Sequence, residues 1–167
     1  MLNFYKLHSD PNELFGYKDA HLKIPEIAWE VANTNEKKRK IEYLWVSNPE
    51  HAYVYARDVI KKPWSPGEKV IASITAYAFL YARDVIKHPW EPGEKAISSD
   101  PYYAYMYAYH VIKQPWELGE KAIASNPYYA YMYAYHVIKQ PWAPGEKAIA
   151  RNPYWKQRYE KTFNVTL

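Results

Sequence analysis

The side chains most able to bind a metal ion or to transfer a proton are six histidines, which are scattered along the 167-residue chain. They stand at positions 8, 21, 51, 88, 110 and 136, with no His-x-x-x-His or Glu-x-x-His pair among them. Metal sites usually place their ligands at such short spacings. The sequence also has no cysteine, no glycine-rich phosphate loop and no nucleophile elbow. It therefore predicts a protein that is not an enzyme and that holds no metal and no cofactor.

The residues that do recur belong to a tandem repeat with a period of twenty-six residues. Three residue types return at this spacing in four copies: Trp64, Trp90, Trp116 and Trp142; Gly67, Gly93, Gly119 and Gly145; Glu68, Glu94, Glu120 and Glu146. The segment from Pro101 to Trp116 recurs letter for letter as Pro127 to Trp142. The predicted units are 48–73, 74–99, 100–125 and 126–151. With an N-terminal capping segment, 1–47, and a C-terminal capping helix and tail, 152–167, they are expected to form a single compact domain.

Each unit is predicted to be a helical hairpin. Three units begin with Asn-Pro or Asp-Pro, in which the first side chain accepts hydrogen bonds from free helix amides and proline suits the first helical position. The second unit has Ile74 there, so Ser73 or Thr75 is expected to cap its helix. Small and apolar residues then recur at i, i+3, i+4, i+7 and i+8, which is one face of a helix. The proline before each tryptophan ends this helix, and a shorter helix follows, which in the first unit begins at Pro66-Gly67-Glu68.

The predicted fold class is therefore all-α, a solenoid-like stack of short helical hairpins. Long helices are expected near 49–61, 75–87, 101–113, 127–139 and 153–162, and short helices near 67–73, 93–99, 119–125 and 145–151. The alternating tyrosines between Tyr103 and Tyr109 would also suit a β-strand. The first two units favour the helix, because the adjacent charges of Arg57-Asp58 and Arg83-Asp84 break the alternation but fit the outer side of a helix.

The two ends of the chain depart from the repeat. Residues 1–24 contain many turn formers and predict a partly irregular cover, followed by a helix from Pro25 and a second helix from Lys40 to Val46. The helix beginning at Pro153 replaces the alanine stripe by polar residues, so it is expected to close the stack.

Composition limits the setting in which the protein works. The chain has no cysteine, no apparent secretory signal and no run of eighteen apolar residues, which predicts a cytoplasmic protein that does not enter a membrane. The net charge is +4, but the four units carry only +1, 0, −1 and +2. Nearly neutral repeats argue against nucleic acid as the partner, because binding a phosphate backbone requires cations.

Aromatic residues provide the strongest indication of a binding surface, since they make up 18% of the chain. The four repeat tryptophans could form a ligand cage or stack on bases, but we interpret them as core residues that fill the gap between hairpins.

In the third and fourth units, tyrosines and methionines occupy outer positions where the earlier units carry Phe79, Arg57 and Arg83. His110 and His136 join this surface, and stacked units would hold them about 10 Å apart, too far for one metal ion. The candidate binding residues are Tyr102, Tyr105, Met106, Tyr109, His110, Tyr128, Tyr131, Met132, Tyr135 and His136.

The repeat itself resembles a known type. The pattern Asn-Pro-x-Tyr-Ala-Tyr-x-Tyr-Ala-x-x-Val-Ile-Lys-x-Pro-Trp-x-x-Gly-Glu-x-Ala-Ile is similar to a short helical repeat of uncharacterised proteins from bacteriophages and other large DNA viruses, over about residues 48–153. This resemblance implies a viral origin and a helical stack, and it brings no activity and no functional residues. Tetratricopeptide and Sel1 repeats are similar in kind but have longer periods.

Together these features predict a non-enzymatic module that binds another protein through its repeats. In its concrete form, which rests on the resemblance, it is a viral inhibitor or adaptor of a host protein. Two alternatives remain open: a binder of single-stranded nucleic acid or of a small ligand, with tyrosines stacking on bases, and a structural or self-assembling virion component.

Overall fold

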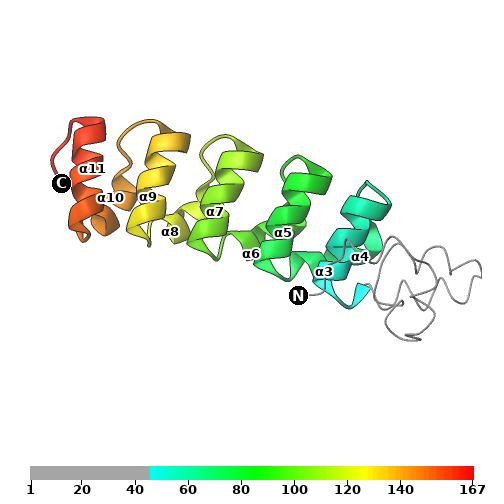
Figure 1. The fold of residues 1–167 in the computed structure, drawn as a ribbon. Helices are drawn as coiled ribbons and strands as arrows, with labels where there is room; N and C mark the ends of the chain where they lie inside the picture. Colours follow the sequence, from blue (N-terminus) through cyan, green and yellow to red (C-terminus); the bar gives the residue numbers. More distant parts are fainter. Residues whose placement is uncertain (1–45) are drawn as a thin grey trace, which may run out of the picture. The chain divides into compact units, whose positions relative to one another are not determined.

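The fold is known from a computed structural model that describes residues 46–167 (Figure 1). The chain divides into two compact units, Met1–Val70 and Ile71–Leu167. Residues 46–167 contain helices and connecting turns and no β-strand. The all-α prediction is therefore confirmed, and the tyrosine-rich stretch that could have suited a strand is helical.

In the first unit, one helical hairpin is described. Helix α3 (Pro49–Val54) continues into a π-helical turn, η4 (Tyr55–Val59), and α4 (Ser65–Ala72) follows, its last two residues lying past the unit boundary. The ring of Tyr55 packs edge-on against Trp64, with 4.8 Å between ring centroids. The long helix is thereby fixed against the connection that leads into the short one.

The second unit repeats this hairpin and stacks the copies. Its long helices stand side by side in one row, with the short helices packed against them (Figure 1). The long helices are α5 (Thr75–Tyr81) with η5 (Ala82–Ile86), α7 (Pro101–Tyr107) with η6 (Ala108–Ile112), α9 (Pro127–Tyr133) with η7 (Ala134–Ile138), and α11 (Pro153–Phe163). The short helices are α6 (Glu91–Ile97), α8 (Glu117–Ile123) and α10 (Ala143–Ala150). The predicted solenoid-like stack is thus observed, with boundaries within two residues of those predicted.

Side-chain caps begin the long helices as the sequence predicts, with one exception. The Oδ1 atom of Asn126 accepts hydrogen bonds from the amides of Tyr128 and Tyr129 at 3.0 and 3.3 Å, and Asn48, Asp100 and Asn152 make the same contacts. The predicted cap of α5 is wrong, because the N-cap position is held by Ile74 rather than by Ser73 or Thr75. Thr75 instead donates from its hydroxyl to the carbonyl of Ala96, at 3.1 Å. The hydroxyl therefore joins a long helix to the short helix of its own hairpin.

Each long helix before α11 ends in a wider π turn that the sequence analysis did not predict. The amide of Lys113 donates to the carbonyl of Ala108, five residues earlier, at 2.7 Å, and Lys87 and Lys139 repeat this bond. These lysines have φ values of 59–63°, the left-handed conformation in which glycine is more usual. The left-handed residue stops the helix and turns the chain toward the proline and tryptophan that follow.

The tryptophans are buried, as predicted, and their packing explains the recurring glycines. Trp116 is 8% exposed and lies directly over Gly119. A Cβ atom added to Gly119 would meet Cε3 of Trp116 at 2.4 Å, much closer than atoms can approach. The other three Trp–Gly pairs have the same geometry. The glycine is thus required by the close approach of the indole, and not by a positive φ.

A tyrosine hydroxyl joins each hairpin of the second unit to the next. The hydroxyl of Tyr133 accepts a hydrogen bond from the amide of Trp116, at 2.7 Å, and donates to Oε1 of Glu120, at 3.0 Å, both in the preceding repeat. The ring of Tyr133 packs meanwhile against Trp142 of its own repeat, at 4.9 Å. The same hydrogen bonds are made by Tyr107 with Trp90 and Glu94, and by Tyr159 with Trp142 and Glu146. The recurring glutamate is therefore a hydrogen-bond acceptor between repeats.

Two sequence predictions fall largely outside this description. The N-terminal capping segment, 1–47, with its two expected helices, lies outside the described residues except for its last two. Whether the chain forms one domain stays a prediction. Within residues 46–167, no helix combines the length and apolar character needed to cross a membrane.

Replacing Trp116 by alanine should destabilise the protein by about 3–5 kcal/mol, because it removes a buried indole and leaves a cavity over Gly119. Chemical denaturation followed by circular dichroism measures this loss. Leu118→Ala, at a neighbouring position that is 55% exposed, is the control and should change stability by no more than about 0.5 kcal/mol. Equal melting of wild type and Trp116→Ala would show that the indole is not a core residue.

The bridging tyrosines should make the fold sensitive to alkali. Burial raises the pKa of Tyr159 from its ordinary value of 10.0 to about 12, and burial likewise raises the pKa of Tyr107 and Tyr133. A raised pKa means that folding favours the protonated phenol, so this stability is complete below pH 10 and is lost as the pH rises toward 12. Absorbance of the phenolate and helical circular dichroism, followed together, should show that these tyrosines ionise only as the helices unfold. Full ionisation of all tyrosines with the helices intact would contradict this.

Candidate functional site

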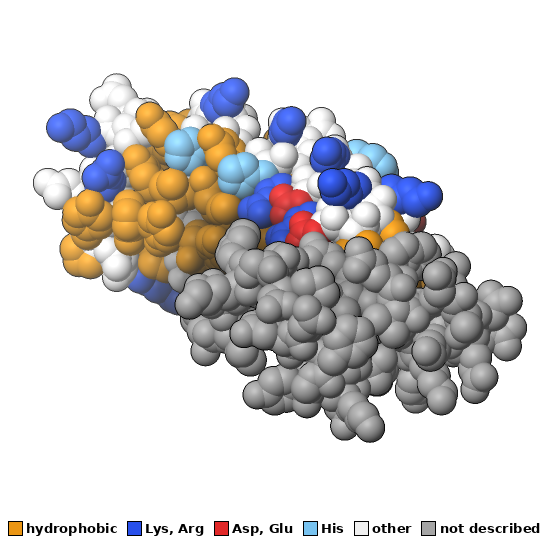
Figure 2. All heavy atoms as spheres, turned by 45° about the vertical axis from the view of Figure 1, so that its right-hand side comes forward, with side chains coloured by type: hydrophobic (Ala, Val, Ile, Leu, Met, Phe, Trp, Pro, Cys, Tyr) orange, Lys and Arg blue, Asp and Glu red, His pale blue; other side chains and the backbone are white. Residues whose placement is uncertain are grey.

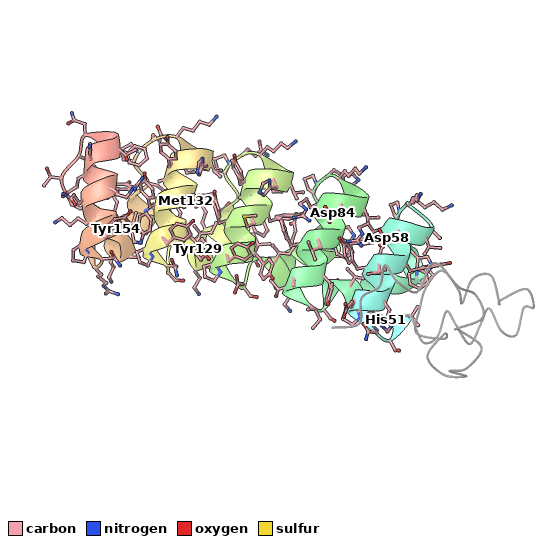
Figure 3. All side chains as sticks on the ribbon, viewed as in Figure 1. His51, Asp58, Asp84, Tyr129, Met132 and Tyr154 are labelled. Atoms are coloured by element: carbon pink, nitrogen blue, oxygen red, sulfur yellow. The ribbon has the colours of Figure 1, made fainter. Side chains whose placement is uncertain are left out.

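The ten candidate binding residues all lie on two neighbouring long helices of the second unit, α7 with η6 and α9 with η7. Four of the tyrosines are exposed, and Tyr154 on α11 is exposed beside them. We call these five residues the aromatic face: Tyr102, Tyr109, Tyr128, Tyr135 and Tyr154. Figure 2 shows hydrophobic side chains gathered in one broad patch on this side of the molecule, with histidine and basic side chains at its border. Met106 and Met132 are half-buried on the same helices, and Figure 3 labels Met132.

Two of the candidates are not at the surface, which corrects the sequence prediction. Tyr105 is 6% exposed and Tyr131 is 5% exposed. They occupy the position of Phe79, which was also predicted to lie outside and is buried. This position points into the seam between adjacent long helices: Phe79 packs on Tyr103, and Tyr131 stacks on Trp155 at 5.4 Å. Burial accordingly raises the pKa of Tyr105 to about 12.

The sequence analysis missed the aromatic side chains that fill these seams from the following helix. Tyr129 contacts both Tyr102 and Tyr105 of the preceding repeat, with centroid distances of 5.7 and 6.2 Å. Trp155 stands one repeat later and contacts Tyr128 and Tyr131 in the same way. The signal was present in the sequence, since an aromatic residue recurs at positions 77, 103, 129 and 155. These contacts join the exposed tyrosines into one layer.

His136 closes the outer edge of the first of these seams. Its ring packs on Tyr109 of the preceding repeat at 5.2 Å, so His136 is half-buried. His110 is exposed, as predicted, and its pKa is lowered first by partial burial and then by the charge of Arg83. Among the described residues, no three side chains of the types that bind metals are placed to hold an ion.

The first two repeats have charged residues, Arg57 and Arg83, at the positions that Tyr109 and Tyr135 occupy in the third and fourth repeats. In the second unit, Arg83 lies over the ring of Phe79 at 5.1 Å and pairs with Asp84 at 2.6 Å. Tyr109 takes the place of Arg83 one repeat later and stacks on Tyr105, with centroids 5.9 Å apart and ring planes 13° apart. In the first unit, Arg57 lies over Tyr53 in the same way and pairs with Asp58. Either an arginine or a tyrosine can therefore cover the buried ring one helical turn earlier.

Tyr109 and Tyr135 occupy the same position in consecutive repeats, but Tyr135 is the more exposed of the two, with 49% of its surface accessible against 41% for Tyr109. The reason lies in the next helix. Thr162 stands where His136 stands one repeat earlier, so no imidazole ring from this position packs on Tyr135 as His136 packs on Tyr109. Tyr135 lines two hollows of about 610 and 600 Å³, and we call them the Tyr135 hollows. Their lining side chains are Tyr109, Tyr135, His136, Lys139, Gln157, Arg158, Lys161, Thr162 and Phe163.

No protein-family model, curated protein or solved structure matches this chain. The aromatic face offers tyrosine rings and hydroxyls beside basic side chains. Such a surface can make apolar contacts through its rings and donate hydrogen bonds through its hydroxyls.

Tyr131→Ala should destabilise the protein by about 3–5 kcal/mol, because Tyr131 fills a buried seam. Tyr109→Arg with Tyr135→Arg should stay within about 1 kcal/mol of wild type, because Arg83 shows that arginine fits this position. Urea denaturation of the three proteins measures both effects. A surface role for Tyr131 would instead be indicated if its alanine variant were as stable as the arginine double variant.

Proposed function

We propose that this chain is a non-enzymatic protein-binding module that contacts its partner through the aromatic face. One observation supports the proposal most directly. The third and fourth repeats have exposed tyrosines, Tyr109 and Tyr135, at the position where the second repeat has Arg83, which forms an ion pair with Asp84. Because both versions cover the buried ring beneath them, packing alone does not require tyrosine there. The exposed tyrosines are thus free to serve a purpose other than folding.

The chemistry of these side chains suits a protein partner. Tyrosine offers a large contact area at a low entropic cost, since it has only two side-chain torsions, and it is enriched among residues that dominate binding energy. On the aromatic face, the seam contacts of Tyr102, Tyr109 and Tyr128 limit the motion of these rings before binding. A partner therefore meets a preorganised surface, which lowers the cost of ordering.

The resemblance of the repeat to viral proteins supports a more specific form of the proposal, an inhibitor or adaptor that acts on a host protein. The two alternative functions, nucleic-acid binding and self-assembly, predict that different molecules are recovered with the protein. A nucleic-acid binder would be recovered with nucleic acid, and a self-assembling component would be recovered with copies of itself.

Tyr109→Arg with Tyr135→Arg should lower affinity for the natural partner by at least about tenfold, since each tyrosine at the centre of an interface can contribute about 1–2 kcal/mol or more. The partner is first identified by affinity capture from host cells with wild-type protein and mass spectrometry. Its affinity for each variant is then measured by calorimetry.

A matched control changes two exposed lysines on the short helices, Lys121→Glu with Lys147→Glu. This variant should bind the partner as wild type does. Unchanged affinity of the tyrosine double variant, with its fold intact, would exclude the aromatic face as the binding surface. Capture of nucleic acid that persists at high salt would favour the nucleic-acid alternative.

A further inference from the structure

We propose that the Tyr135 hollows recognise an acidic segment of the partner, in which aspartate or glutamate stands beside a leucine or an aromatic residue. This inference rests on the proposed function and assigns the partner's chemistry at that surface. Two features of the hollows support this inference: basic side chains that no carboxylate of residues 46–167 neutralises, and the half-exposed ring of Tyr135, which lines both hollows.

Arg158 is the most clearly placed of these cations. Its guanidinium lies 5.9 Å from the ring centroid of Tyr131, 5.8 Å from that of Tyr154 and 6.0 Å from that of Trp155. Nη1 also donates a hydrogen bond to the hydroxyl of Tyr154, at 3.1 Å. Aromatic faces attract a cation without neutralising its charge. Arg158 is therefore held in position while its charge remains available.

The arginine of the second repeat, Arg83, has a carboxylate partner. Arg83 is paired with Asp84 at 2.6 Å, so its charge is satisfied within the chain. Within residues 46–167, no ion pair joins Arg158, Lys139 or Lys161 to a carboxylate. Two of these three cations lie on α11, and Lys139 follows η7. Both hollows are thus lined by basic side chains and by no acidic one.

The charge balance of residues 126–167 agrees with this local picture. This stretch has six basic side chains and only two carboxylates, Glu146 and Glu160. Glu146 accepts a hydrogen bond from the hydroxyl of Tyr159. Glu160 accepts a hydrogen bond from the amide of Leu167, and its Oε1 atom lies 3.7 Å from Nζ of Lys156. Both carboxylates are therefore engaged away from the hollows, and an anionic partner would supply the missing charge.

The half-exposed ring of Tyr135 supplies the apolar half of the site. Tyr109 is covered in part by His136, whereas Tyr135 has Thr162 at the corresponding place. A leucine or aromatic side chain of a partner can fill this space against Tyr135 while a neighbouring carboxylate reaches Arg158 or Lys161. The combination of an aromatic anchor and a charge-assisted hydrogen bond gives both affinity and register.

A peptide fits these observations better than a single strand of nucleic acid. A strand of phosphates needs cations along its whole path. The cations of the hollows lie at one end of the aromatic face, whereas the third repeat has a net charge of −1. The distribution matches a short acidic segment.

The test is a selection from a random peptide library displayed on phage, carried out on the full chain. Wild type should enrich peptides with aspartate or glutamate next to leucine, phenylalanine, tyrosine or tryptophan. Arg158→Glu with Lys161→Glu should instead enrich lysine and arginine at the acidic positions. Lys121→Glu with Lys147→Glu makes the same change of charge on the short helices and should select the wild-type peptides.

A synthetic copy of one enriched peptide then gives affinities by fluorescence anisotropy. Arg158→Gln with Lys161→Gln, a milder change that protects against misfolding, should weaken binding by at least about tenfold. Replacing the acidic residues of the peptide by their amides should weaken binding to wild type similarly, and should matter little to the glutamine variant.

Three outcomes would overturn the inference: no enrichment, enrichment without acidic residues, or the same peptides selected by the charge-reversed protein. If the selected peptides lose affinity on Tyr109→Arg with Tyr135→Arg but not on the changes at Arg158 and Lys161, the aromatic face binds proteins and only the acidic specificity fails. If neither pair of changes matters, both proposals fail. Tight binding of a fluorescent oligothymidylate that depends on Arg158 would assign the cations to nucleic acid.

Discussion

The stacking of this protein depends on a tyrosine hydroxyl that belongs to one repeat and forms its hydrogen bonds in the one before. Tyr133 shows the arrangement: its ring lies against Trp142 of its own hairpin, and its hydroxyl joins the amide of Trp116 to Glu120. The amide of Trp116 begins a short helix and has no partner within that helix. Leaving such a buried group without a partner costs about 1–3 kcal/mol, so the bridge favours one relative placement of consecutive hairpins.

This constraint explains why the repeat keeps its period. In the second unit, each tryptophan and the tyrosine that binds its amide are separated by seventeen residues along the chain, in all three pairs. An insertion between them would move the hydroxyl away from both of its partners. The glycine beneath the indole adds a second limit, because any larger residue at Gly119 would displace Trp116 and with it the amide that Tyr133 caps. The interior of each hairpin is therefore fixed, and variation is confined to the outer side of the long helices.

Sequence periodicity was sufficient to predict most of this architecture. The prolines and capping residues placed the helices to within two residues, and the recurring tryptophans were correctly predicted to be core residues. The recurring glycine and glutamate were interpreted only as the start of the short helix, so the close approach of the indole and the hydrogen bonds between repeats were missed. Periodicity shows which residues share a helix face, but not how deeply the next helix covers that face. For this reason Tyr105 and Tyr131 were placed outside although the following helix buries them. The π turns were missed because no residue type marks them, and the left-handed lysines occupy positions where glycine would have been the recognisable signal.

The aromatic face was found in part because its residues change between repeats whose core does not. The difference in exposure between Tyr109 and Tyr135 could not be predicted in that way, since these two residues stand in identical sequence segments. What distinguishes them is the following helix: the ring of His136 packs on Tyr109, whereas Thr162, Arg158 and Lys161 line the hollows beside Tyr135. In a stack of equal units, the last repeat necessarily meets a different neighbour. The end of the stack is therefore where identical side chains acquire different surroundings, and where a single binding site can arise from a repeated sequence.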